Sequence, residues 1–290
     1  MEELSIIIPT YNRPKILKEV LIAINKQNYD LKKVEVLVID DFSRINIKKI
    51  IKDLRTDYKL RYIKMKKNCG QGIARNKGIK LSKGRYLLFI GDDMIPNKDL
   101  INNHMKLHLK NRGIAVLGRV IWDERVKNEF MDYIEKVQFH YNTIRDYNNV
   151  KLHFYTSNIS LEKRWLINEK YSSKFKNYGL EDLELGYRLE KKGLRVIYNP
   201  DALVYHFHVY NFKQFCIRMF NVGKSAVIFT NLHPELKRKY IPKTINIIKV
   251  GSIILSKKYI YKINKKLYWY SNFVYWYIKG IETENKNVEE

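Results

Sequence analysis

The 290-residue sequence predicts an α/β protein with a mostly parallel sheet flanked by helices, followed by a helical C-terminal extension. Short apolar runs alternate with amphipathic segments over residues 1–112, which is the pattern of a parallel sheet covered on both faces. Polar clusters follow three of the runs: PTYNRP, DDFS and GDD. Ligands of such sheets bind outside the carboxyl ends of the strands, so the clusters also predict a nucleotide site.

The spacing of apolar residues defines the expected elements. Apolar residues three to four apart predict helices between strands in the first part of the chain, over 13–27, 44–54 and 70–82, and continuous runs predict the strands 4–10, 34–41, 60–65 and 85–93. The middle of the chain mixes further strand-like runs with helices predicted over 125–147 and 180–192. From residue 211 helical spacing dominates, and the polar tail 282–290 is predicted to be disordered.

Composition limits the classes of partner and the compartment. A net charge of +25 favours nucleic acid, an anionic membrane surface or phosphorylated substrates without choosing among them. Cys69 and Cys216 lie far apart, so a reducing, cytoplasmic location is expected. The N-terminus does not have the pattern of a signal peptide, and no apolar run reaches the ~18 residues that a spanning helix needs.

Two pairs of adjacent aspartates follow predicted strands. Asp92 and Asp93 suit a divalent cation with oxygen ligands, Mn²⁺ or Mg²⁺, although Gly-Asp-Asp is also good turn chemistry. In the pair Asp40 and Asp41, one acid would cap the following helix while the other accepts a hydrogen bond from a base or ribose. Taken alone, each pair fits a structural role as well as a functional one.

Acids and histidines near residues 180–208 suggest further chemistry. Glu181 and Asp182 fall in the first turn of a predicted helix, where acids complement the helix dipole, but an ionised acid there would also serve as a general base. His206 and His208 lie on the same face of a predicted strand, which makes one of them a candidate metal ligand. The spacing does not say which of the two binds.

These segments, taken together, resemble the family 2 glycosyltransferases, whose GT-A fold has a Rossmann-like nucleotide-binding sheet. The resemblance rests on blocks in family order over residues 1–210, namely SIIIPTYNRPKILKEVLIAI, VLVIDDFS, NCGQGIARNKGI, GRYLLFIGDD, TSNISLEKRWL and YGLEDLELGYRLEKKGLRVIYNPDALVYHFH. It implies a nucleotide-binding half over 1–112 and an acceptor-binding half over 113–210, with 211–290 as a helical extension.

The resemblance implies a role for residues at the nucleotide. Thr10 and Tyr11 would meet the base and ribose, and Asp41 would contact the base, usually uracil. Arg75 would lie near the nucleotide, and Asp92 near the ribose.

The remaining implied roles concern the metal and the sugar. Asp93 and His206 would bind the cation that bridges the diphosphate, and Asp182 would be the catalytic base. Asn158 and Glu181 would face the donor or acceptor sugar. Gly91 stands where the family usually has the first acid of a D-x-D triplet, so any role of that carboxylate is lost.

The implied activity is inverting transfer of one sugar from a nucleotide-diphosphate sugar, with UDP favoured, to a hydroxyl of a glycan, lipid-linked or protein acceptor. The expected setting is bacterial cell-surface polysaccharide or glycoconjugate synthesis. The Q-x-x-R-W motif of processive synthases is missing, since Gln214 and Arg218 have the wrong spacing and Met219 stands in place of Trp. This absence predicts single addition.

Residues 245–290 interleave aromatic residues with lysines, as in KKLYWYSNFVYWYIKG. That pattern is typical of an interfacial membrane element, which would put the protein on the inner face of the cell membrane. The alternative is packing on the catalytic domain or on a second subunit of a homodimer. Two other functions fit less well. A sugar nucleotidyltransferase would have a glycine-rich loop after the first strand, and in a nucleic-acid-binding protein the ordered acids would repel phosphate.

Overall fold

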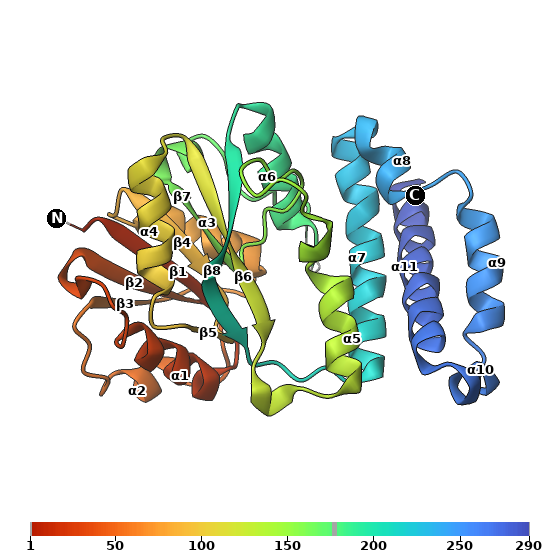
Figure 1. The fold of residues 1–290 in the computed structure, drawn as a ribbon, viewed down its shortest axis with the longest axis horizontal. Helices are drawn as coiled ribbons and strands as arrows, with labels where there is room; N and C mark the ends of the chain where they lie inside the picture. Colours follow the sequence, from red (N-terminus) through yellow and green to blue (C-terminus); the bar gives the residue numbers. More distant parts are fainter. Residues whose placement is uncertain (1, 176–178, 290) are drawn as a thin grey trace. The chain divides into compact units, whose positions relative to one another are not determined.

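The computed structural model describes residues 2–175 and 179–289. The chain forms two compact units (Figure 1). The first comprises residues 1–172 and 182–208, and the second comprises residues 173–181 and 209–290.

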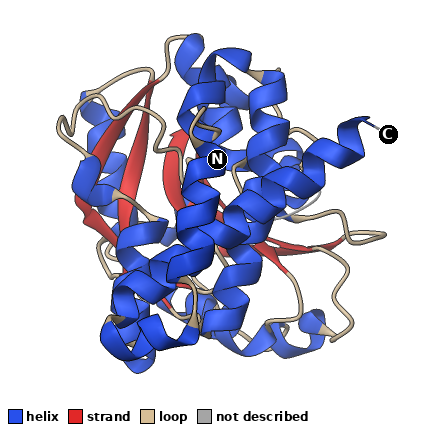
Figure 2. Ribbon diagram, turned by 90° about the vertical axis from the view of Figure 1, so that its right-hand side faces the viewer, coloured by secondary structure: helices blue, strands red, loops and turns tan. Residues whose placement is uncertain are grey.

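The first unit contains an eight-stranded sheet with the strand order β3-β2-β1-β4-β7-β6-β8-β5. Figure 2 shows its strands in red, with helices around them. The strands are β1 (Leu4–Thr10), β2 (Val34–Asp40), β3 (Lys59–Lys64), β4 (Tyr86–Ile90), β5 (Met94–Pro96), β6 (Ile114–Trp122), β7 (Asn158–Glu162) and β8 (Arg195–His206).

The strands of the N-terminal half pair as predicted, whereas the other half of the sheet is mixed. β1 is parallel to β2 and β4, and β2 is parallel to β3. β7 is antiparallel to both β4 and β6, β6 is parallel to β8, and the short β5 is antiparallel to the end of β8. The sheet is therefore an α/β sheet whose parallel part carries the polar clusters at its carboxyl edge.

Helices cover both faces of this sheet. On one face, apolar residues of α1 (Pro14–Ile24), α2 (Ile47–Ile51) and α4 (Leu100–Lys110) pack on β1 residues such as Ile6 and Ile8. On the other face, α3 (Gln71–Leu81) and α6 (Glu181–Lys191) pack on Ile7 and its neighbours. Side chains alternate between the faces of a strand, and β1 is buried on both, which explains its unbroken apolar sequence.

The predicted helix over 125–147 is wrong in length. The chain forms the short 3-10 helix η2 (Glu124–Val126), then α5 (Glu129–Gln138) and the 3-10 helix η3 (Tyr141–Thr143). Asn128 caps α5 by accepting hydrogen bonds from the N–H groups of Phe130 and Met131. His140 has φ = 47°, a left-handed conformation that an α-helix cannot contain, so α5 ends before it.

The second unit is helical among its described residues. Its helices are α7 (Phe212–Leu232), η5 (Pro234–Leu236), α8 (Lys237–Tyr240), α9 (Ile245–Leu255), α10 (Lys258–Ile263) and α11 (Lys265–Glu289). α7 and α11 pack so closely that a Cβ atom on Gly223 would lie 2.0 Å from the carbonyl oxygen of Tyr277, and one on Gly280 would lie 2.0 Å from that of Phe220. The two glycines make this close approach of the helices sterically feasible.

The predicted disordered tail is helical as far as the structure describes it, because α11 continues to Glu289. Two of its acids pair with lysines of neighbouring helices. Glu282 forms an ion pair with Lys249 of α9, and Glu284 with Lys224 of α7. Within residues 2–175 and 179–289, every helix is too short or too polar to span a bilayer.

Candidate active site

The carboxyl edge of β4 brings one carboxylate and two histidines together. β4 ends at Ile90, and Gly91, Asp92 and Asp93 lead directly into β5. β5 then pairs with the end of β8, with Met94 opposite His206, and the N–H of Phe207 donates to the carbonyl oxygen of Asp93. This backbone pairing places the side chains that flank Phe207 over the carboxylate of Asp93.

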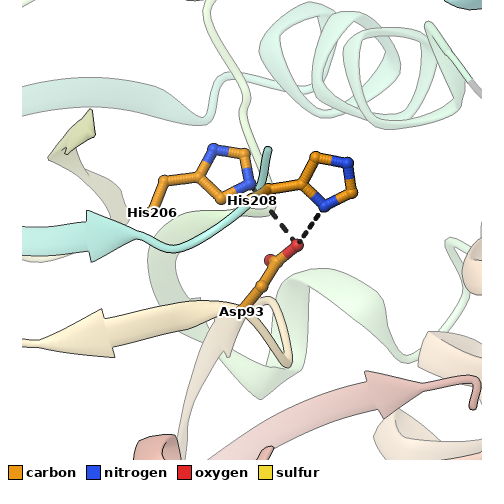
Figure 3. Close-up of side chains that lie close together, drawn as sticks. All are labelled: Asp93, His206 and His208. Atoms are coloured by element: carbon orange, nitrogen blue, oxygen red, sulfur yellow. Dashed lines mark ion pairs between the residues drawn. The ribbon is translucent and has the colours of Figure 1, made fainter. Parts of the chain in front are cut away.

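His206 and His208 both point toward Asp93 (Figure 3). His206 Nε2 and His208 Nδ1 each lie 3.4 Å from Asp93 Oδ2, and the three candidate ligand atoms lie within 4.8 Å of one another. The His206 ring stacks on the Trp122 ring at a centroid distance of 4.6 Å, which orients it. The sequence left open which histidine would meet a metal. In the structure, both histidines lie beside Asp93.

The Asp93 side chain is buried, yet its surroundings strongly favour its ionised form. Burial opposes its ionisation, but the hydrogen bonds and charges of His206, His208 and Arg13 outweigh this and hold its pKa well below the ordinary value. Asp92 is affected in the opposite direction, since burial and the neighbouring Asp93 raise its pKa. The two adjacent acids are therefore electrostatically distinct.

Arg13 is a site residue that the sequence interpretation missed. Its Nη1 atom contacts carboxylate oxygens of both Asp92 and Asp93, and its side chain is 40% exposed. Thr10 donates a hydrogen bond of 2.7 Å to the other oxygen of Asp92. β1 and β4 are parallel neighbours, so the loop after β1 had to lie beside the two acids. The cation in PTYNRP was the signal that could have identified Arg13.

Asp41 at the end of β2 is bound by the segment that leads into α3. Its two carboxylate oxygens accept hydrogen bonds of 2.8 Å from the N–H groups of Cys69 and Gly70. Burial raises the pKa of Asp41, against the effect of these two donors. Asp40, its fully buried neighbour, accepts from Ser43 N–H and Tyr62 O–H. The prediction that one acid of the pair caps the following helix is wrong, because Asn46 caps α2 by accepting from Lys49 N–H. Asp40 instead holds the turn that follows β2.

Two further residues predicted at the nucleotide differ in exposure. Tyr11 is 43% exposed beside the buried Thr10. Arg75 is buried in α3, where its Nη2 donates to Gln71 Oε1 and its guanidinium lies over the Tyr171 ring. A cleft of about 510 Å³ lined by Arg44, Asn46, Lys48, Tyr62 and Lys64 opens near the ends of β2 and β3. Its three cations, which the sequence interpretation also missed, suit an anionic ligand.

Asp182 lies in the first turn of α6 and is oriented by backbone donors. Its Oδ2 accepts from Thr156 N–H at 3.3 Å, and its Oδ1 from Leu183 N–H at 2.9 Å. Thr156 is two residues before Asn158, which pairs with Ile90 at the end of β4. This register anchors Asp182 to the same edge of the sheet. Glu181 is buried and accepts a hydrogen bond from Gly179 N–H.

Asn158 is fully buried, and its side-chain amide forms hydrogen bonds with other residues of the protein. Its Nδ2 donates to the carbonyl oxygens of Arg119 and Ala202, and its Oδ1 lies 2.9 Å from His104 Nε2. The structure therefore gives Asn158 a role in holding β6, β7 and β8 together. A contact of Asn158 with the donor or acceptor sugar stays a prediction.

The family model for "Glycosyl transferase family 2" matches residues 5–169. The chain belongs to glycosyltransferase family 2. The chondroitin synthase of Escherichia coli is 27% identical over 241 residues, an alignment that covers 71% of this chain and 35% of that protein. The chain thus spans about a third of the length of this relative.

Solved structures share the GT-A fold. A mannosyltransferase from Pyrobaculum calidifontis in complex with GDP-Man and Mn²⁺ aligns with a TM-score of 0.73 and 16% identity, covering 98% of this chain and 87% of that one. Staphylococcus aureus TarS 1-349 in complex with UDP-GlcNAc aligns with a TM-score of 0.58 and 16% identity, covering 98% and 92%. These similarities establish the fold.

In this family 2 glycosyltransferase, the residues present fit a divalent cation. One buried carboxylate and two imidazoles converge on a single point, and Asp93 is held ionised, as a metal ligand must be. Imidazole ligands suit transition metals better than Mg²⁺. The donor set is therefore compatible with a divalent transition-metal ion.

Proposed function

We propose that this glycosyltransferase moves a single sugar from a nucleotide-diphosphate sugar, UDP-linked in preference, to an acceptor hydroxyl with inversion at the anomeric carbon. The observation that carries the proposal is the convergence of Asp93, His206 and His208 at the end of β4. The complexes of similar folds with GDP-Man and Mn²⁺ and with UDP-GlcNAc support this class of donor.

The donor nucleotide binds along the carboxyl edge of the parallel strands, within the nucleotide-binding half, 1–112. Asp41 contacts the base with lone pairs left over from its two backbone donors, and Tyr11 covers the base from its exposed position. Thr10 orients Asp92, which meets the ribose. Arg75 lies near the nucleotide at the first turns of α3.

Asp93, His206 and His208 hold the cation. When bound, a divalent cation neutralises the charge that the diphosphate gathers as the glycosidic bond breaks. Arg13 already compensates the two acids in the protein alone, so its guanidinium moves toward the phosphates when donor binds. Arg13 thus compensates the two acids in the free protein and the phosphates in the donor complex.

Asp182 acts as the general base. The donors Thr156 N–H and Leu183 N–H orient its carboxylate and leave lone pairs for the proton of the acceptor hydroxyl. The deprotonated oxygen attacks the anomeric carbon opposite the departing phosphate, so the configuration inverts. Glu181 contributes beside it to the binding of a sugar. The acceptor is a glycan, lipid-linked or protein hydroxyl bound by the half 113–210, in cytoplasmic synthesis of cell-surface polysaccharide or glycoconjugate.

A thermal-shift screen of the full chain tests the donor class. UDP, GDP and dTDP are each added with and without Mn²⁺, and single-stranded DNA is the competing ligand. We expect UDP to raise the melting temperature more than the other nucleotides, and only with Mn²⁺ present. Stabilisation by GDP instead of UDP would show that the donor nucleotide carries guanine. Stabilisation by DNA alone would refute the proposal.

Replacement of Asp182 by Asn tests the base. Asp182→Asn is expected to lower release of UDP from the donor sugar by at least about 100-fold, since general-base catalysis contributes on that order. The UDP–Mn²⁺ thermal shift should stay unchanged. Asp201→Asn, at an exposed position of β8, is the matched control and should keep full activity. Substantial activity in Asp182→Asn would show that another group takes the proton.

A further inference from the structure

The helix α9 has its polar and apolar faces reversed relative to a helix of a soluble protein. Ser252 is 5% exposed, and Lys249 forms an ion pair with Glu282 of α11, so the polar side packs inward. Ile247, Val250 and Ile254 are 74%, 58% and 53% exposed. These three residues are spaced by three and four, so they form one apolar stripe along the outer side of the helix.

The following helix α10 continues this pattern. Tyr259, Tyr261 and Ile263 are exposed, and lysines 258 and 262 are interspersed among them. Figure 1 shows α9 and α10 next to each other within the helical unit. We call Ile247, Val250, Ile253, Ile254, Tyr259, Tyr261 and Ile263 the α9–α10 face.

The aromatic stretch that the sequence singled out has a different role. Trp269 and Phe273 of α11 are 6% and 2% exposed, and Phe273 packs on Phe212 and Phe215 of α7. Gly280 of the same stretch is in close contact with the α7 backbone. One side of KKLYWYSNFVYWYIKG therefore packs in the core of the helical unit, although Tyr270 and Trp276 of the same stretch are exposed. The continuous exposed apolar stripe lies on α9 and continues into α10.

Charge identifies the kind of partner. Residues 237–268 contain ten lysines and arginines and no Asp or Glu. A second copy of this surface would be repelled by the same positive charge. An anionic lipid surface offers both the apolar phase that the isoleucines need and the negative charge that the lysines need.

We propose that the α9–α10 face lies on an anionic lipid bilayer. The eleven residues of α9 form a rod of about 16 Å that lies parallel to the membrane surface, with its isoleucines at the acyl boundary. The exposed lysines 257, 258 and 262 meet lipid phosphates, and the tyrosines of α10 sit at headgroup level. This inference is independent of the sugar, the base and the catalytic residues.

Vesicle flotation of the full chain tests the proposal. Phosphatidylcholine vesicles with and without phosphatidylglycerol are compared at low and high salt. We expect the protein to float with the anionic vesicles only, and to be released in part by salt because the lysine contribution is screened. Protein that stays at the bottom with anionic vesicles would overturn the proposal.

Matched variants distinguish lipid binding by the α9–α10 face from nonspecific adsorption through other exposed apolar residues. Ile247→Asn/Ile254→Asn should lower the partition coefficient by about tenfold or more, since two exposed apolar side chains no longer enter lipid. Leu109→Asn/Ile167→Asn, at positions 76% and 64% exposed in the first unit, should bind as the parent does. Equal losses in both double variants would overturn the assignment to α9.

The charge contribution has its own pair of variants. Lys257→Gln/Lys258→Gln/Lys262→Gln should lower binding by about fivefold per lysine, and Lys98→Gln/Lys106→Gln/Lys110→Gln should have little effect. Light scattering gives the oligomeric state of each protein. A dimer that the Ile247→Asn/Ile254→Asn variant converts to a monomer would assign the face to a second copy and overturn the membrane proposal.

Discussion

The two aspartate pairs of the sheet occupy equivalent positions but have different surroundings. Asp40 and Asp41 follow β2, Asp92 and Asp93 follow β4, and both strands are parallel neighbours of β1. The first pair is satisfied by neutral donors: Ser43 N–H and Tyr62 O–H at Asp40, and Cys69 N–H and Gly70 N–H at Asp41. These groups belong to the fold and are present without any ligand.

The second pair is compensated by charge and by imidazoles. Arg13 contacts both acids, and two histidines face Asp93. A guanidinium can be displaced and an imidazole nitrogen can coordinate, so this arrangement can exchange one cation for another. Adjacent acids at the same kind of strand end are thus compensated in different ways, and we expect only the second pair to bind a metal.

The largest expected effect separates the two pairs directly. Asp93→Asn should abolish Mn²⁺-dependent stabilisation and lower transfer by at least about 100-fold, because loss of a metal ligand removes several kcal/mol of charge stabilisation. Asp40→Asn should instead lower the melting temperature without metal and keep the Mn²⁺-dependent shift. Thermal shift and release of UDP measure both. An unchanged Mn²⁺ shift in Asp93→Asn would contradict the distinction between the pairs.

Two buried histidines on α4 add a test based on the pH dependence of stability. His104 and His108 of α4 both lie 2.8 Å from Ser160 Oγ. Burial lowers the pKa of His104 to about 4. Burial, together with His104, lowers that of His108 to about 3, while nearby Glu162 and Arg85 act in opposite directions.

Stability should therefore fall in acid. The unfolded state binds protons below a histidine pKa of about 6.5, whereas the folded state does not until about pH 4. The stabilisation is complete above pH 6.5 and is lost as pH falls, at up to about 1.4 kcal/mol per pH unit for each histidine. Urea unfolding between pH 7 and pH 5 measures the slope. His108→Gln should reduce the slope of unfolding free energy against pH. A slope equal to that of the parent would contradict burial of His108 in its neutral form.

The smallest expected effect concerns a single neutral donor of the first pair. Tyr62→Phe removes the hydroxyl that donates to buried Asp40 and should cost about 1–2 kcal/mol of unfolding free energy. Nucleotide and Mn²⁺ shifts should be retained, since Ser43 N–H still holds the other oxygen. A loss of the Mn²⁺ shift in this variant would mean that the two pairs are coupled.

The parallel half of the fold was predictable because each strand there is buried on both faces. Unbroken apolar runs such as β1 and β4 and the polar clusters after them identify both the elements and the edge that carries the site. The family resemblance predicted from these blocks is confirmed by the family model. Local pattern and tertiary environment agree in this part of the chain.

Pairing across the mixed half was not predictable. β5 has three residues, and only its antiparallel pairing with β8 brings His208, beyond the strand end, to Asp93. The cross-strand hydrogen bonds of Asn158 were not predictable either, because an amide that cross-links three strands and one that faces a sugar look the same in a sequence. In the C-terminal unit, the pattern of KKLYWYSNFVYWYIKG could not separate a helix–helix core from a lipid-facing surface. That distinction depends on which face α7 covers.

Electron spin echo modulation of Mn²⁺ bound to the full chain with UDP tests the proposed metal site directly. Imidazole nitrogens coordinated to Mn²⁺ produce nitrogen modulation, so the parent protein should show it strongly. His206→Gln and His208→Gln should each weaken this modulation, and the double variant should lose it. Bound Mn²⁺ without nitrogen modulation in the parent protein would show that Asp93, His206 and His208 do not together hold the cation.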